Sequence, residues 1–420
     1  MSLANNVEFL RRLPKLNAAN AANAVAQLAR GLRPDVKSPL VEVKGFGRNP
    51  GDLKMFAFVP TKLQQPRALV VVLHGCGQTA AGYDLGAGWS TLAKHYGFAL
   101  VMPEQQASNN ANGCFNWFSP EDTARDRGEA GSIRQMIAHM VTDYGIDPRR
   151  VFITGLSAGG AMTSTMLATY PDAFAAGAII AGLPFGVASN VRDALLGMRA
   201  SPSRPAEKLG DLVRKASNHK GPWPKLSVWH GSADRTVNPG NADEIVKQWL
   251  DVHNLPPEPM SEVMVDGHPR QVWWNTDGET IIESYTITDM AHGTPLGKAE
   301  NDHSYGAQGA FMIEAGISSS YHIAKFFGLT DWIKKAKTAA LDSPSAKLIP
   351  AVSPISAAPA QMPDLSKVLW PLAAIKPPAE PEPQPKSQIK PRSKPKPERR
   401  RGIDVSAVIT RALTAAGLMK

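Results

Sequence analysis

The sequence predicts an α/β fold, with a doubly wound, mostly parallel sheet that carries helices on both faces. Three observations predict it. Short continuous apolar runs recur along residues 38–335, segments of helical periodicity lie between them, and the connections are short. Apolar runs of this kind suit strands that are covered on both faces, and strand–helix–strand repetition builds a parallel sheet. Residues 38–335 are therefore expected to form one domain with an extension at each end.

The first half of this domain supplies three expected strands. Residues 68–73 (ALVVVL), 98–102 and 151–154 are apolar runs of strand length. Between the second and third runs, apolar residues recur at i, i+3, i+4, i+7, i+8 and i+11, namely Ile133, Met136, Ile137, Met140, Val141 and Tyr144. This spacing predicts one amphipathic helix, and Gly145 is a natural stop for it.

The second half continues the alternation. Residues 226–229 and 281–287 are expected strands, and residues 242–252 form an expected helix between them. The order of strand, helix and strand is thus maintained to the end of the domain.

The formal net charge of +9 is concentrated at the ends of the chain. Residues 371–402 hold nine Lys and Arg against three Asp and Glu, residues 1–37 hold six against two, and residues 403–420 hold two against one. Residues 38–370 therefore carry a net charge of about −2. A mildly acidic body is a poor match for polyanions, so no nucleic-acid partner is expected.

The two ends are expected to differ in structure from the domain. Residues 1–37 predict a basic helical extension. Residues 336–402 lose periodicity, and nine prolines between 371 and 402 favour an extended, semi-rigid linker. Residues 403–420 predict a short amphipathic helix, whose apolar face comprises Val405, Val408, Ile409, Ala412, Leu413 and Ala416. That face needs a partner: the parent domain, another protein, a polymer surface or a membrane interface.

No targeting or membrane signal is evident in the sequence. Residues 1–16 contain charges and Pro where a secretory signal requires an apolar stretch. No run reaches the ~18–20 apolar residues of a membrane span, so no transmembrane segment is expected. The two cysteines, Cys76 and Cys114, are too few for a zinc cage of cysteines. They are either two free core thiols or one disulfide.

The strongest chemical signal is the motif Gly155-Leu156-Ser157-Ala158-Gly159. It follows the apolar run 151–154 directly and precedes a helical segment. This is the context of a nucleophile elbow, a strand–turn–helix in which a strained serine backbone lifts the hydroxyl clear of the sheet. The small glycines let the flanking chain approach closely. Ser157 is therefore predicted to be a nucleophile.

A serine hydroxyl needs a general base and a group that orients the base, and after such an elbow the acid precedes the His along the chain. Asp234 follows the predicted strand 226–229, and His292 follows the predicted strand 281–287. Sites of open α/β sheets lie past such strand ends, so Asp234 and His292 are the predicted acid and base. The other candidate bases are interpreted as surface or packing histidines: His268, His303 and His322.

The oxyanion of an acyl-transfer intermediate requires preorganised amide donors. One donor is expected to be the amide of Ala158, because it directly follows the nucleophile. The other is expected from residues 74–77 (HGCG), the loop after the first of the predicted central strands.

Four motifs give the chain a resemblance to a known family. They are LHGCGQTAAGY (73–83), NGCFNWF (112–118), RVFITGLSAGGAM (150–162) and WHGSADRTVNPGNADEIVKQW (229–249). Together they resemble the esterase family of poly(3-hydroxybutyrate) depolymerases, to which feruloyl and acetylxylan esterases are related. The resemblance covers about residues 40–330 and implies an α/β-hydrolase fold. It also implies a triad of Ser157, Asp234 and His292.

The same resemblance implies further roles for three residues. The Cys76 amide would be the second oxyanion donor, and Cys76 and Cys114 would form a disulfide. Trp117 would be a flat apolar wall for an acyl chain or an aromatic ring, with core packing as the alternative. Family members that attack extracellular polymers are exported, so the resemblance implies an extracellular location. A cytoplasmic location, where disulfides are disfavoured, is the alternative because no secretory signal is evident.

These observations predict a serine carboxylic-ester hydrolase that works through an acyl-enzyme on poly(3-hydroxybutyrate)-type polyesters or their oligomers. The alternatives are a feruloyl- or acetylxylan-type carbohydrate esterase, a peptidase, or a non-catalytic protein that binds polymer granules. No cofactor and no metal is expected. The sequence shows no dinucleotide fingerprint, no phosphate-binding loop and no metal-ligand spacing.

Overall fold

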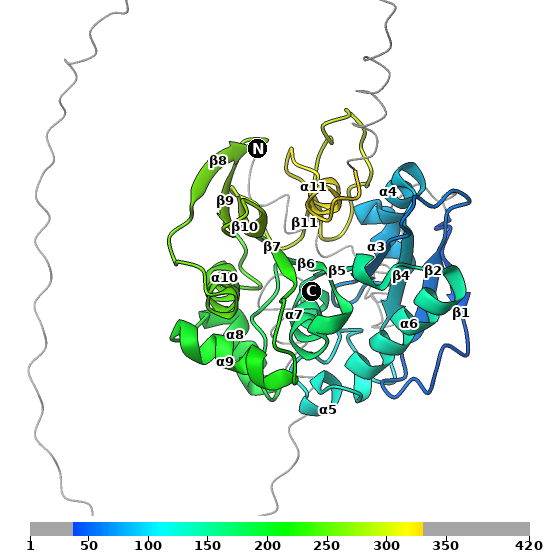
Figure 1. Cartoon of the computed structure of the whole chain (residues 1–420), viewed down its shortest axis with the longest axis horizontal. Helices are drawn as coiled ribbons and strands as arrows, with labels where there is room; N and C mark the ends of the chain where they lie inside the picture. Colours follow the sequence, from blue (N-terminus) through cyan, green and yellow to red (C-terminus); the bar gives the residue numbers. More distant parts are fainter. Residues whose placement is uncertain (1–36, 331–420) are drawn as a thin grey trace, which may run out of the picture. The chain divides into compact units, whose positions relative to one another are not determined.

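The computed structural model describes residues 37–330 (Figure 1). The expected linker 336–402, the expected helix 403–420 and the expected extension 1–37, apart from Lys37, lie outside the described residues.

A ten-stranded sheet forms the centre of the domain. Its strand order is β1-β2-β4-β3-β5-β6-β7-β10-β9-β8. The strands are β1 (Val41–Val43), β2 (Lys54–Phe58), β3 (Leu69–Leu73), β4 (Ala99–Glu104), β5 (Val151–Leu156), β6 (Ala176–Ile180), β7 (Lys225–Gly231), β8 (Ser261–Val265), β9 (His268–Trp274) and β10 (Thr280–Ile287). The strands from β4 to β10 in this order pair in parallel, as the sequence predicts. The pairs outside them, at both edges of the sheet, are antiparallel.

Helices cover both faces of the sheet, and each face has its own apolar core. The helices are α3 (Ala80–Ala87), α4 (Trp89–Tyr96), α5 (Pro120–Thr123), α6 (Gly128–Tyr144), α7 (Ala158–Thr169), α8 (Val191–Ala200), α9 (Ala206–Ala216), α10 (Gly240–His253) and α11 (Ser319–Phe326). Side chains of α6, α7, α9 and α10 belong to one core, and those of α3, α4 and α11 belong to the other. Along β3, Val71 points into the first core while Val70 and Val72 point into the second, as strand alternation requires.

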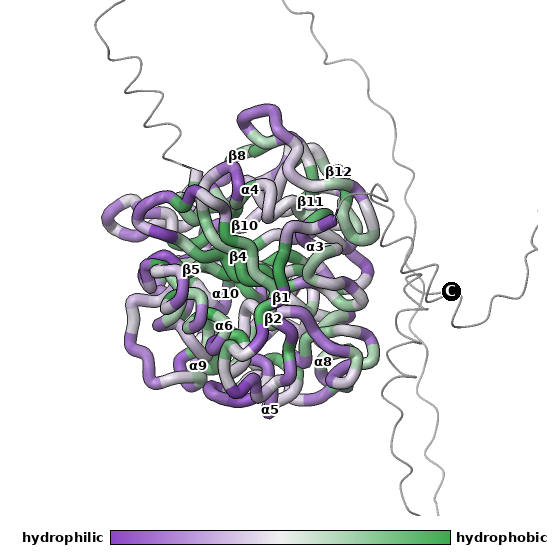
Figure 2. Tube along the Cα trace, turned by 90° about the vertical axis from the view of Figure 1, so that its right-hand side faces the viewer, coloured by the Kyte–Doolittle hydropathy of each residue, from purple (hydrophilic) through white to green (hydrophobic). Residues whose placement is uncertain are grey.

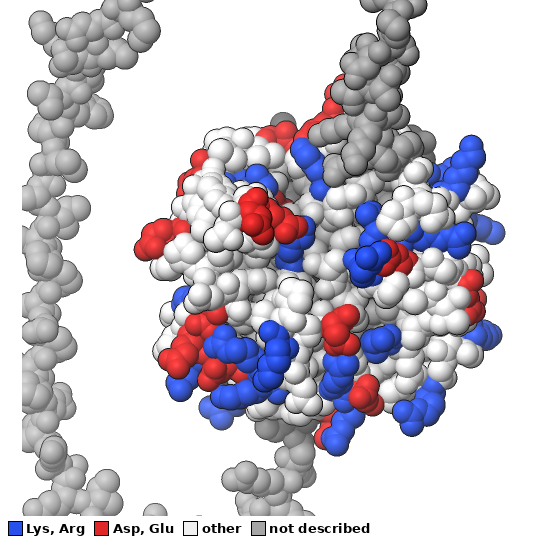
Figure 3. Space-filling model, viewed as in Figure 1, with Lys and Arg blue, Asp and Glu red and all other residues white. Residues whose placement is uncertain are grey.

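The outside of the domain is polar, and its charges are mixed. In Figure 2 the apolar segments gather on the central strands, and hydrophilic segments lie toward the periphery. On the face shown in Figure 3, acidic and basic side chains are interspersed. Within residues 37–330, no helix is both long enough and apolar enough to span a membrane.

The parallel strands end in register along one edge of the sheet. Leu73 pairs with Gly155, Leu156 with Ile180, and Gly231 with Ile287. The loops that follow β3, β5, β7 and β10 therefore leave the sheet at the same edge. Small elements complete the domain after β10: β11 (Thr294–Leu296) and β12 (Met312–Glu314) form a separate two-stranded sheet.

Candidate active site

Ser157 occupies the sharp turn between β5 and α7. Its backbone has φ +57° and ψ −117°, a region that non-glycine residues rarely enter. Two backbone hydrogen bonds hold the turn: Ser157 N–H donates to Ile180 O at 2.9 Å, and Ala161 N–H donates to Ser157 O at 2.8 Å. The strain is thus sustained by the neighbouring strand β6 and by the first turn of α7. This conformation is the one expected of a nucleophile elbow.

The glycines of the motif are required by close backbone contacts. A Cβ atom on Gly155 would lie 2.4 Å from Gly159 O. A Cβ atom on Gly159 would lie 2.4 Å from Leu73 O and 2.5 Å from His74 O. These neighbours are backbone atoms of α7, of β3 and of the β3 exit loop, which cannot rotate away as a side chain can.

We expect Gly159→Ala to lower the free energy of unfolding by about 3 kcal/mol or more, because the new methyl group collides with two carbonyl oxygens. Gly197→Ala in α8 is the matched control. Its Cβ atom would lie 3.5 Å from Leu183 Cδ2, an ordinary contact, so the helix should gain up to ~1 kcal/mol. Urea unfolding of both variants measures the difference. Equal stability of the two variants would contradict the close packing of the elbow.

Asp234 and His292 are joined by a short hydrogen bond at this edge of the sheet. His292 Nδ1 lies 2.6 Å from Asp234 Oδ2, and both side chains are buried. The other oxygen, Asp234 Oδ1, accepts the amides of Thr236 at 2.8 Å and Val237 at 2.9 Å. A carboxylate only accepts hydrogen bonds, so Nδ1 of His292 carries the proton and Nε2 is left as an acceptor. The pair has the chemistry of an oriented general base.

A second histidine, which the sequence analysis did not single out, contacts the same carboxylate. His230 Nε2 lies 3.2 Å from Asp234 Oδ2 and 2.9 Å from Val237 O. Burial alone would raise the pKa of Asp234, but the hydrogen bonds from His230 and His292 outweigh burial and lower that pKa. Asp234 therefore stays ionised. The signal in the sequence was a His four residues before the acid, in the motif HGSAD.

The structure brings Asp234 and His292 into contact and places Ser157 at the same sheet edge. No hydrogen bond joins Ser157 Oγ to His292 among the contacts within residues 37–330. Ser157 Oγ and His292 Nε2 are not among the buried side-chain atoms that lack a hydrogen-bond partner within residues 37–330. Neither atom is therefore fully enclosed, and a ligand can reach both. Hydrogen bonds between nucleophile and base are often long without substrate and tighten when it binds.

The three competing histidines have partners elsewhere. His268 Nε2 lies 2.7 Å from Ala315 O, and His322 Nε2 lies 2.9 Å from Asp266 Oδ2. His303 Nδ1 lies 2.9 Å from Asn301 O, in an exposed loop. These contacts agree with their interpretation as packing or surface residues.

The loop after β3 presents the amide of Cys76. Its neighbours are engaged, since Gly75 N–H donates to Gln78 Oε1 and Gly77 N–H donates to Asn112 O, both at 2.8 Å. Within residues 37–330 the Cys76 amide has no acceptor. The Ala158 amide is the first of α7, and such amides have no partner inside their own helix. Among residues 37–330, neither predicted oxyanion donor has an acceptor: Cys76 lies in the loop after β3, and Ala158 begins the helix that follows the adjacent strand β5.

Buried contacts fix the Cys76 loop from two sides. Cys76 and Cys114 form a disulfide, with Cα atoms 4.2 Å apart. His74 is fully buried, its Nε2 accepts the Gln105 amide at 3.1 Å, and its Nδ1 donates to Gly75 O at 2.8 Å. Burial lowers the pKa of His74 to about 4, so this imidazole stays neutral. His74 is therefore a structural support of the loop.

Trp117 follows Cys114 in the loop that the disulfide anchors. The side chain is only 9% exposed and belongs to the core on the α6 and α7 side of the sheet. Its ring meets Phe118 edge-on, with centroids 5.6 Å apart. Core packing accounts for these contacts, and a role as a substrate wall stays a prediction.

The same loop is held by a buried carboxyl group on α6. Glu129 Oε2 accepts the Asn116 amide at 2.9 Å, and Oε1 accepts Asn116 Nδ2 at 2.8 Å as well as Gln105 Nε2. Burial raises the pKa of Glu129 to about 8, and the nearby Asp122 adds to the rise. Glu129 is thus a buried titratable group that contacts the 110–118 loop through Asn116.

We expect the free energy of unfolding to fall as pH rises from about 4.5 to about 8 because of Glu129. In this window the folded protein keeps a proton that the unfolded chain releases. Each unit of difference between the folded and unfolded pKa values lowers the free energy of unfolding by ~1.4 kcal/mol across the window. Glu129→Gln should lose this slope while all other groups titrate as before. Urea unfolding at several pH values measures the free energy of unfolding of both proteins. If the difference in this free energy between wild type and Glu129→Gln stays constant with pH, the assignment is wrong.

Comparisons with known proteins give the site its context. The family described as "Esterase PHB depolymerase" matches residues 56–256. Poly(3-hydroxyalkanoate) depolymerase C of Paucimonas lemoignei is 45% identical over 291 residues, which are 69% of this chain and 70% of that protein. An acetylxylan esterase of Coprinopsis cinerea is 33% identical over 263 residues, which are 61% of this chain and 69% of that protein.

The fold also matches a solved esterase. The structure of an acetyl xylan esterase from Aspergillus awamori superimposes with a TM-score of 0.59 at 24% identity, over 70% of this chain and 100% of that chain. The likeness supports the α/β-hydrolase fold that the sequence predicts. The identity to the two enzymes above, together with the family match over residues 56–256, leads to one conclusion: this chain belongs to the PHB depolymerase family of esterases.

Proposed function

We propose that this esterase cleaves poly(3-hydroxyalkanoate)-type polyesters or their oligomers through an acyl-enzyme on Ser157. The observation that carries the proposed chemistry is the 2.6 Å hydrogen bond between Asp234 and His292, at the sheet edge where the strained Ser157 turn lies. The proposed substrate class is supported by the 45% identity to a poly(3-hydroxyalkanoate) depolymerase.

In this proposal each residue has one task. Ser157 Oγ attacks the ester carbonyl while His292 Nε2 takes its proton, and the amides of Cys76 and Ala158 stabilise the oxyanion. His292 then gives the proton to the departing alcohol, and water repeats the cycle to release the acid. Asp234 keeps His292 in the tautomer that the first step requires. Trp117 and the predicted helix 403–420 are candidates for contact with the substrate chain or polymer surface.

Identity to acetylxylan and feruloyl esterases favours a second substrate class, acetyl or feruloyl esters on plant polysaccharide. Purified enzyme should be offered amorphous poly(3-hydroxybutyrate), its soluble oligomers, acetylated xylan and feruloylated arabinoxylan. Release of 3-hydroxybutyrate, without acetate or ferulate, is the expected result. Release of acetate or ferulate alone would transfer the assignment to the carbohydrate esterases. Cleavage of none of them, by folded protein, would favour a non-catalytic granule-binding protein.

His230 is proposed to act as a positioning residue, because it holds the carboxylate that orients the base. We expect His230→Leu to lower kcat about 10- to 100-fold with little change in KM, the effect of removing one hydrogen bond to a buried charge. His230→Gln keeps an N–H group and should recover part of the loss. Steady-state kinetics on p-nitrophenyl butyrate measure both variants. If both lose kcat equally, packing rather than the hydrogen bond explains the loss.

A further inference from the structure

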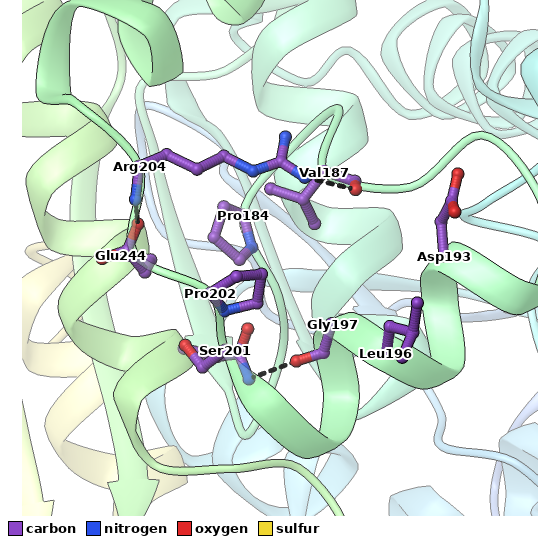
Figure 4. Close-up of a pocket in the computed structure, with 10 residues that line it drawn as sticks. Pro184, Val187, Asp193, Leu196, Gly197, Ser201, Pro202, Arg204 and Glu244 are labelled. Atoms are coloured by element: carbon purple, nitrogen blue, oxygen red, sulfur yellow. Dashed lines mark hydrogen bonds between the residues drawn. The ribbon is translucent and has the colours of Figure 1, made fainter. Parts of the chain in front are cut away.

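A pocket of about 260 Å³ lies beside α8 and contains none of the proposed catalytic residues (Figure 4). Its sides come from the chain after β6, from α8, from the turn after α8 and from the start of α10. The volume is just below the ~300–1,000 Å³ of pockets that take drug-sized ligands. It therefore suits a fragment of a longer molecule.

One part of the α8 pocket is apolar and open to solvent. Pro184, Val187, Leu196 and Pro202 line it. Leu196 is 53% exposed, although it is among the larger apolar side chains of the domain. A ligand that covered this leucine would remove apolar area from water, which favours an aliphatic group.

The polar part of the pocket offers hydrogen-bond donors. Ser201 Oγ is buried and has no partner, and the Ser201 backbone is held at φ +40°, a conformation that non-glycine residues rarely adopt. Arg204 donates to Val187 O at 3.0 Å, as Figure 4 shows, and a guanidinium has further N–H groups to give. The Ser201 hydroxyl is enclosed by the protein, so the remaining N–H groups of Arg204 are the donors that a carbonyl oxygen of a ligand could reach.

Charged side chains of both signs surround the same pocket, and their charges balance. Asp193 and Glu244 both line it. Glu244 already accepts the Arg204 amide at 3.0 Å and pairs with Lys247, so its charge is balanced within the protein. Asp193 and Glu244 are thus matched by Arg204 and Lys247, and a site without net charge suits a neutral ester better than a free carboxylate.

The pocket is tied to the loop that carries Asp234. Asn238 N–H donates to Met198 O at 2.7 Å, and Asn241 Nδ2 donates to Gly197 O at 3.1 Å. The end of α8 is thereby attached to the turn that follows the acid. The pocket is therefore connected to the loop after β7, which leaves the sheet at the same edge as the Ser157 turn.

We propose that the α8 pocket binds one neutral aliphatic ester unit of the substrate chain, remote from the bond that is cleaved. This inference rests on the proposed function and deepens it. A polyester repeats an alkyl group and an ester carbonyl in each unit, and the pocket offers an apolar wall and donors for those two groups. The pocket thus favours oligomers and polymer over single short esters.

Two variants test the pocket in different ways. Leu196→Glu removes the apolar wall and adds charge at an exposed position, and Gly197→Leu fills the space next to Leu183. Val41→Glu on β1, at a position 66% exposed, is the matched control for a surface Glu. Each protein is assayed on p-nitrophenyl butyrate, which holds no remote unit, and on a methyl-ester-capped tetramer of 3-hydroxybutyrate.

We expect both pocket variants to raise the KM for the tetramer about tenfold. Losing the contact with one leucine side chain lowers affinity by about a factor of ten. Turnover of p-nitrophenyl butyrate should stay within about twofold of wild type, and Val41→Glu should match wild type on both substrates. An unchanged KM for the tetramer overturns the inference. An equal loss on both substrates also overturns it, because the variants then act on the fold.

The binding of the tetramer to Ser157→Ala separates this inference from the proposed function. If wild type cleaves p-nitrophenyl butyrate but not the tetramer, the proposed substrate class is wrong. Calorimetry with Ser157→Ala then measures tetramer binding without cleavage and so tests the pocket independently of the proposed function. If Ser157→Ala binds the tetramer and the added Leu196→Glu substitution weakens that binding about tenfold, the result supports the pocket. If the tetramer does not bind, or if Leu196→Glu leaves its affinity unchanged, the inference is refuted.

Discussion

Ser157→Ala is expected to lower kcat for p-nitrophenyl butyrate by at least ~10⁴-fold, with little change in KM. The hydroxyl is the only part of the side chain that the substitution removes, and in the proposed mechanism it forms the covalent bond to the acyl group. The amides of Cys76 and Ala158, which have no acceptor in the described part of the chain, remain, so a small residual rate is expected. Initial rates and circular dichroism, measured on the same preparation, check the loss of activity and the retained fold.

A matched serine shows whether the loss is specific. Ser108 is exposed in the loop after β4, and Ser108→Ala should keep wild-type activity. A sulfonyl fluoride should label wild type at Ser157 in one-to-one stoichiometry and leave Ser157→Ala unlabelled. Retained turnover in Ser157→Ala, or a label on another residue, would show that the nucleophile has been assigned wrongly.

The central part of the fold could be predicted from the sequence because its strands are buried on both faces. The runs 68–73, 151–154 and 226–229 correspond to β3, β5 and β7, and the predicted helix that stops at Gly145 corresponds to α6. The antiparallel edge strands were not predicted. In β8 the burial pattern has no apolar alternation, since Val263 and Met264 are both exposed. Such a strand is defined by its pairing with β9, which no local pattern encodes.

The candidate site divides in the same way. Ser157, Asp234 and His292 could be proposed as a triad from the sequence because each follows a recognisable strand and this fold places nucleophile, acid and base in that order along the chain. His230, His74 and Glu129 were missed as supporting residues. Their contacts run to Asp234, to Gln105 and to Asn116, and only the folded chain shows that these partners are buried together. A sequence shows that a polar residue is present, but whether it is buried with a partner depends on tertiary packing.

Removing the Cys76–Cys114 disulfide is expected to lower the free energy of unfolding by about 4 kcal/mol and to lower kcat as well. The bridge spans 38 residues, and closing a loop of that length in the unfolded chain accounts for the stability term. The loss of kcat has a different cause. The bridge connects the loop that presents the Cys76 amide to the loop that Glu129 holds, and a displaced oxyanion donor costs up to about 10²–10³-fold in kcat.

The two single variants, Cys76→Ala and Cys114→Ala, make this prediction sharp. Both lose the bridge, and both keep the backbone amide at position 76, so the bridge accounts for their effects only if the two variants lose stability and kcat equally. Wild type treated with dithiothreitol should reproduce both losses, and thiol titration of untreated wild type should find no free thiol. A large loss in Cys76→Ala beside a small one in Cys114→Ala would instead assign the effect to the side chain at position 76. Unchanged kcat in both, with stability lost, would mean that His74 and Gln78 suffice to hold the oxyanion loop.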